Sequence, residues 1–138
     1  AAFALFEIGR VEDAATCFLH GTLNFPRAAK MLVGIRTDSP TNRDEAVDHN
    51  AGFDIHRNLK RYLTGRGRKA IAFFNRFLNH PRVSKLISEI EEVKRKWGEE
   101  HRTGERSAFD RMMLMQTPEF AAREGKEPGR ELWTEAKS

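Results

Sequence analysis

Apolar residues recur every three or four positions along almost the whole chain, which is the spacing that places them on one face of an α-helix. Val and Ile, which favour strands, number only eleven among the 138 residues. The sequence also lacks the Asn-Gly and Asp-Gly pairs that typically close β-hairpins. We therefore predict an all-α fold, and the length is typical of one domain.

Glycine and proline divide this pattern into helical segments. The expected helices span residues 1–8, 12–23, 27–33, 42–64, 68–79, 83–97, 106–115 and 118–124. A loop is expected near residues 34–42, and Gly52 favours a break near Asn50. Residues 1–125 thus form the predicted helical domain, and residues 126–138 form a polar tail that is mobile unless Trp133 docks.

The segment 42–64 combines an apolar stripe with a basic face. The stripe recurs every four residues: Val47, Ala51, Ile55, Leu59 and Leu63. Arg57, Lys60 and Arg61 lie on the opposite side, because positions i, i+3 and i+4 share a helix face. The glycine-rich turn that follows adds three more basic residues: Arg66, Arg68 and Lys69.

Charge is distributed unevenly along the chain. Residues 55–88 hold nine basic residues and no acid, whereas both flanks are weakly acidic. The net charge of +4 therefore hides a strongly basic middle segment. Such a segment favours an anionic partner, either an acidic protein or a nucleic acid.

Two further features concern the cellular setting and the chain ends. A single cysteine, Cys17, cannot form an internal disulfide, which favours the reducing cytoplasm. No apolar run approaches the length of a membrane span, so we expect no membrane association. Apolar residues begin at Ala1 with no capping residue before them, and we therefore expect the chain to be a fragment of a longer protein.

A pattern of small and aromatic residues marks the first two helical segments. Taking Ala14 as position 0, Gly9, Phe18, Gly21 and Pro26 lie at −5, +4, +7 and +12. Two antiparallel helices approach closely only where the crossing residues are small, and a proline then ends the pair. This pattern resembles the second half of a tetratricopeptide repeat (TPR), with residues 1–8 as a truncated first helix.

A less regular copy follows at Gly65, Ala70, Phe74 and Phe77, with Pro81 one residue early. The resemblance implies antiparallel helical hairpins stacked as a short array, with an additional C-terminal helix. In TPR proteins the first helix of each pair lines a concave groove, and basic residues there commonly hold acidic peptides. The resemblance thus implies a non-enzymatic protein-interaction scaffold that binds an acidic segment through Arg57, Lys60 and Arg61.

Two alternatives remain for the basic face. It can be an ordinary solvated helix face, because most charged runs have no further role. It can also contact nucleic acid, since six cations in thirteen residues could neutralise phosphates and Tyr62 could stack on a base. No recognised nucleic-acid motif accompanies it.

The sequence offers little for metal binding or catalysis. His49 and His56 are seven residues apart, about 10 Å along a helix, too far to share a metal ion. Cys17 lies between core-facing positions, where an inert thiol is expected. We therefore predict no catalytic residue, no metal site and no cofactor.

Overall fold

The computed structural model describes residues 1–100 and 103–137 as an assembly of α-helices, with no strand among these residues. The expectation of an all-α fold is confirmed. The helices are α1 (Ala2–Glu7), α2 (Val11–Asn24), α3 (Pro26–Leu32), α4 (Arg43–Thr64), α5 (Arg68–Asn79), α6 (Pro81–Glu100), α7 (Ser107–Met115) and α8 (Pro118–Lys137).

Most helix ends follow from local residue chemistry. Gly9 and Gly34 adopt positive φ angles of 84° and 81° after α1 and α3, a backbone conformation that L side chains rarely adopt. The Asn42 side chain caps α4 by accepting a hydrogen bond of 2.9 Å from the Glu45 amide. These ends were all predicted from the sequence.

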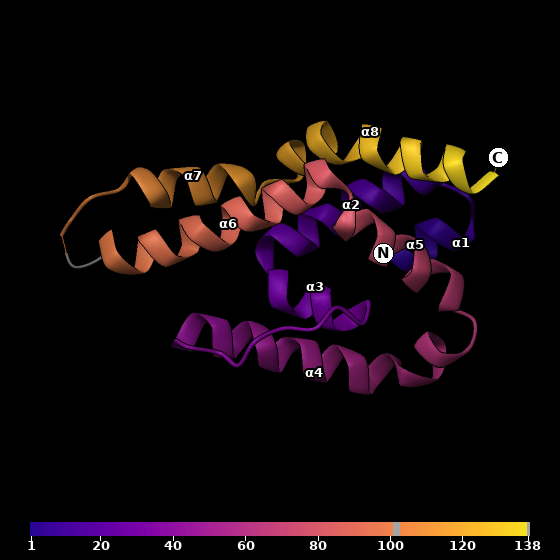
Figure 1. The fold of residues 1–138 in the computed structure, drawn as a ribbon, viewed down its shortest axis with the longest axis horizontal. Coiled ribbons are helices and arrows are strands. Elements are labelled where there is room, and N and C mark those ends of the chain that lie inside the picture. Colours follow the sequence, from indigo (N-terminus) through magenta and orange to yellow (C-terminus); the bar gives the residue numbers. More distant parts are fainter. Residues whose placement is uncertain (101–102, 138) are drawn as a thin grey trace.

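Helix α2 lies at the centre of the fold, and α8 runs along it (Figure 1). The core is aromatic, and the Phe74 ring of α5 stacks on Phe18 of α2 with centroids 4.2 Å apart. Helices α6 and α7 form an arm that projects from this core (Figure 1). Helices α3 and α4 form a second layer, which lies below α2 in the view of Figure 1.

The predicted helix end at Glu124 is wrong, because α8 continues through Gly125 to Lys137. In the described part of the expected polar tail, residues 126–137, the Trp133 side chain docks on the core. Gly125 and Gly129 are buried against α2, where they let the two helices approach closely. Leu132 is buried, and the Trp133 ring lies 6.0 Å from that of Phe6. Gly125 is therefore a packing residue rather than a helix end. Ser138 lies outside the described residues.

The expected break near Asn50 is also absent, because α4 is continuous from Arg43 to Thr64. Gly52 faces α3, and a Cβ there would lie 2.8 Å from Met31 Sδ and 3.1 Å from Ala28 Cα. The glycine thus permits a close helix contact that offsets its poor helix propensity.

Helices α3 and α4 run parallel, joined by an extended segment that returns beside them (Figure 1). The buried carboxylate of Asp48 on α4 accepts hydrogen bonds from the amides of Arg27 (2.8 Å) and Ala28 (2.9 Å) at the start of α3. Helix α4 contacts α3 much more extensively than it contacts α5, its expected hairpin partner.

The apolar stripe of α4 is only partly buried. Ile55 and Leu59 are 38% and 37% exposed, and Val47 is 56% exposed. The reason is length: α3 has seven residues, about 10 Å, whereas α4 has 22 residues, about 33 Å. Helix α3 therefore covers only part of α4.

Candidate binding surface

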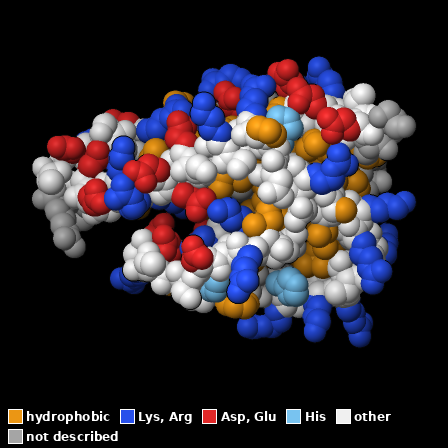
Figure 2. All heavy atoms as spheres, in the orientation of Figure 1, with side chains coloured by type: hydrophobic (Ala, Val, Ile, Leu, Met, Phe, Trp, Pro, Cys, Tyr) orange, Lys and Arg blue, Asp and Glu red, His pale blue; other side chains and the backbone are white. Residues whose placement is uncertain are grey.

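The basic residues predicted as a binding site lie together at the junction of α4 and α5. Three are on the C-terminal half of α4, one is in the connecting turn, and two begin α5. Figure 2 shows cations gathered along the lower and right-hand rim of the molecule, where α4 ends and α5 begins. We call these six exposed residues the basic surface: Arg57, Lys60, Arg61, Arg66, Arg68 and Lys69.

Most cations of the basic surface form no ion pair with a described residue. Only Arg57 forms an ion pair with a described residue, a 3.8 Å contact with the exposed carboxylate of Asp54. The remaining five form no salt bridge with any residue in the described part of the chain: Lys60, Arg61, Arg66, Arg68 and Lys69. Their charge is therefore available to an external anion.

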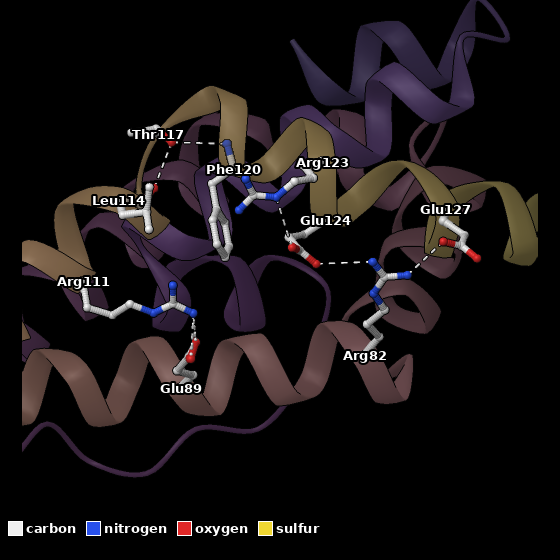
Figure 3. A network of polar contacts seen from close by, with 9 residues as sticks. All are labelled: Arg82, Glu89, Arg111, Leu114, Thr117, Phe120, Arg123, Glu124 and Glu127. Carbon is white, nitrogen blue, oxygen red and sulfur yellow. Dashed lines mark hydrogen bonds and ion pairs between the residues drawn. The ribbon is translucent and has the colours of Figure 1, made fainter.

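Cations at the next corner of the fold are paired instead. Figure 3 shows Arg82 of α6 between two carboxylates of α8, at 3.0 Å from Glu127 and 3.3 Å from Glu124. These hydrogen bonds raise the pKa of the Arg82 guanidinium. Arg76 of α5 contacts Glu135 of α8 in the same way, at 3.2 Å. These basic residues hold α8 in place, although they were indistinguishable from the basic surface in the sequence.

The same network joins α7 to its neighbours (Figure 3). Arg111 donates two hydrogen bonds of 2.9 Å to the carboxylate of Glu89 on α6. The guanidinium groups of Arg111 and Arg123 lie 5.6 Å and 5.2 Å from the centroid of the buried Phe120 ring. Both contacts are cation–π interactions, and the one from Arg111 of α7 fastens the arm to α8.

Sequence reasoning missed one residue of this surface, the exposed aromatic Phe53. Phe53 is 52% exposed and precedes Arg57 by four residues and Lys60 by seven, so the three side chains share the outer face of α4. Its ring packs edge-on against His49, with centroids 4.9 Å apart. The spacing from Arg57 could have revealed it. The outer face therefore combines an apolar anchor with cations.

The nucleic-acid alternative requires the Tyr62 ring to stack on a base, but this ring is engaged in contacts within the fold. Its hydroxyl donates a 2.7 Å hydrogen bond to Glu7, and its ring packs against Phe3 with centroids 5.8 Å apart. The Tyr62 ring also lies against Gly67, where a Cβ would be 2.7 Å from the ring. The ring thus fastens α4 to α1 and is not free to stack on a base.

The surroundings of Tyr62 predict a raised pKa for its hydroxyl. Burial, followed by the hydrogen bond to Glu7, raises the pKa of Tyr62 to about 12. Because Tyr62 is the only tyrosine, tyrosinate absorbance should report this pKa directly, and Glu7→Gln should lower it. The stability linked to neutral Tyr62 is complete below pH ~10, the unfolded value, and is lost as pH rises through the folded value. Titration at the ordinary value in the folded protein would contradict the packing described above.

A separate cavity of about 610 Å³ opens between the start of α4 and the end of α6, and an adjoining hollow measures about 270 Å³. No residue of the basic surface lines either one. Lys94, in both linings, donates to the Asn24 carbonyl at 2.9 Å and lies 3.8 Å from Asp44. The concave groove expected around Arg57, Lys60 and Arg61 is therefore not found at these hollows.

The described residues contain no group of three or more His, Cys, Asp and Glu side chains placed to hold a metal ion. Cys17 is a partly buried free thiol. None of the helices in the described ranges is long and apolar enough to cross a membrane.

No family model matches the chain, and comparisons with the curated proteins and with the solved structures also found no match. The function is therefore inferred from the geometry of the chain itself.

Proposed function

We propose that this chain is a non-enzymatic protein-interaction scaffold that binds an acidic segment of a partner protein through the basic surface. The observation that carries the proposal is the set of five adjacent cations at the junction of α4 and α5 that form no salt bridge with a described residue. Arg76 and Arg82, by contrast, have carboxylate partners on α8. Complementary charge favours association and sets the preferred partner.

Phe53 indicates the composition of the partner segment. Exposed aromatic rings often anchor protein interfaces, because they bury a large apolar area when a partner covers them. Phe53 lies beside Arg57 and Lys60 on the outer face of α4. The segment that fits this surface carries an apolar side chain flanked by Asp or Glu.

Nucleic acid is the alternative occupant of the basic surface, and the packing of Tyr62 weighs against it. The Tyr62 ring packs against Phe3 and its hydroxyl is bonded to Glu7, so it offers no stacking platform for a base.

We also propose that α1 and α2 form a helical hairpin of the TPR type. Helices α1 and α2 pack together across the turn at Gly9, and Ala14 is fully buried on α2. Pro26 then begins α3, as the repeat pattern implies. We place this scaffold in the cytoplasm, where Cys17 would remain reduced.

A matched pair of charge reversals tests the proposal. In Lys60→Glu/Lys69→Glu, both changes fall on the basic surface, so affinity for a fluorescent Asp- and Glu-rich peptide containing Leu should fall at least about tenfold, or ~1.4 kcal/mol. In the control, Lys85→Glu/Lys126→Glu, both lysines are exposed on other helices and form no salt bridge with a described residue. The control has the same net charge but should retain most of the affinity.

Fluorescence anisotropy at two salt concentrations measures both variants. Equal losses in the two variants would mean that only net charge matters, which contradicts a defined surface. Labelled RNA and duplex DNA provide the comparison. A nucleic-acid-binding function predicts tight binding of RNA or DNA to which all the cations contribute. Each cation removed should then lower the slope of log affinity against log salt concentration by about one unit.

A further inference from the structure

Thr64 is the only Ser or Thr between Thr41 and Ser84, and it lies at the centre of the basic surface. It is the last residue of α4 and is exposed. Arg57, Lys60 and Thr64 are spaced by three and four residues, so the Thr64 side chain shares the outer face with these two cations.

The contacts of Thr64 place further cations around it. Its hydroxyl donates a 2.8 Å hydrogen bond to the carbonyl of Lys60, one turn earlier in α4. The Nε of Arg68 donates a 2.7 Å hydrogen bond to the Thr64 carbonyl, which brings that guanidinium next to the residue. Arg61 precedes Thr64 by three residues, and Arg66 follows it by two. An anion attached to this hydroxyl would therefore lie near Lys60, Arg61, Arg66 and Arg68, which form no salt bridge with a residue that the structure describes.

We propose that Thr64 is a phosphorylation site and that its phosphate closes the basic surface to the acidic partner, an inference that rests on the proposed function. The Thr64 oxygen attacks the γ-phosphorus of a nucleoside triphosphate held by a protein kinase. A new O–P bond forms, the bond to the bridging oxygen breaks, and the nucleoside diphosphate leaves with that electron pair. The hydroxyl proton passes to the base of the kinase.

The phosphate acts by charge and by hydrogen bonding. It adds a charge of about −1.5 to −2 at neutral pH and three strong acceptor oxygens. Arginine binds such groups through short, charge-assisted hydrogen bonds. Phosphorylated Thr64 would thus occupy the cations that otherwise attract the partner, and its remaining charge would repel the partner's carboxylates.

The sequence around Thr64 suits a kinase that selects arginine three residues before the acceptor, since kinases discriminate substrates by charge pattern. Ser39 has the same spacing from Arg36 and is exposed in the extended segment before α4. The 22 residues of α4, about 33 Å, separate that segment from Thr64. Ser39 is therefore an internal control, because its phosphate would lie far from the basic surface.

The experiment treats Ser39→Ala and Thr64→Ala variants with an arginine-directed Ser/Thr kinase and Mg-ATP. Mass spectrometry locates the phosphate, and anisotropy measures binding of the acidic, Leu-containing peptide before and after the reaction. In Ser39→Ala, phosphate on Thr64 should weaken binding at least about tenfold. In Thr64→Ala, phosphate on Ser39 should change the affinity less than about twofold.

The outcomes separate the two proposals. If Ser39→Ala binds the peptide but accepts no phosphate on Thr64, or keeps its affinity when phosphorylated, the Thr64 proposal is wrong and the proposed function stands. If neither unphosphorylated variant binds the peptide while circular dichroism shows both to be folded, the proposed function is wrong and the Thr64 proposal falls with it.

Discussion

Phe74→Ala should destabilise the protein by about 3–5 kcal/mol, because it removes the ring at the centre of the aromatic core. Phe74 has no exposed surface, and its ring lies 4.2 Å from Phe18, 5.2 Å from Phe3 and 5.6 Å from Phe73, measured between centroids. These partners come from α1, α2 and α5, so the resulting cavity would weaken the contacts among three helices.

Urea denaturation followed by circular dichroism measures this loss. Phe53→Ala is the matched control, since it deletes the same ring from the exposed outer face of α4. The control should cost less than about 1 kcal/mol. Equal losses in the two variants would contradict the assignment of Phe74 to the core.

Gly129→Leu should cost about 3 kcal/mol or more, because α8 and α2 approach too closely to admit a side chain at this position. A Cβ at Gly129 would lie 2.5 Å from the Cβ of Ala15 on α2, and neither atom can move without shifting a helix. Gly125, one turn earlier, faces Leu19 in the same interface. The substitution should therefore separate the two helices that form the most extensive contact in the fold.

Gly98→Leu is the control for helix propensity. Gly98 is exposed inside α6, and apart from its chain neighbours and the backbone of its own helix, no atom of the described residues lies within 4 Å of the position that a Cβ would take there. Leucine there should be neutral or stabilising by up to ~1 kcal/mol. A similar stability change at both glycines, measured from urea midpoints, would mean that α8 is not packed closely on α2.

The glycines show how far the sequence could predict this fold. Gly9 and Gly34 end helices through a local backbone conformation, which depends on nearby residues and was predicted correctly. Gly125 was interpreted in the same way, but it serves a contact with Leu19 more than one hundred positions away in the chain. A single sequence does not show which distant helix a glycine faces, so the length of α8 was underestimated.

The basic residues show the same limit for the binding surface. Nine cations between residues 55 and 88 are equivalent in sequence, yet the fold pairs Arg76 and Arg82 with carboxylates of α8. Glu127 and Glu135 lie in the segment expected to be a polar tail, so their pairing with α5 and α6 could not be anticipated. The location of Arg57, Lys60 and Arg61 on one face of a helix required only helical spacing, and it was predicted correctly.

Chemical-shift mapping by two-dimensional NMR, with the acidic, Leu-containing peptide titrated into the labelled protein, tests the central claim most directly. The proposed function predicts that the shifted amide signals cluster at Phe53, Arg57, Lys60 and Arg61, and continue through the turn into Arg68 and Lys69. Signals from Lys94 and Trp97, beside the cavity, should stay in place. Shifts centred on that cavity, or spread evenly over all exposed cations, would contradict a protein-binding site at the junction of α4 and α5.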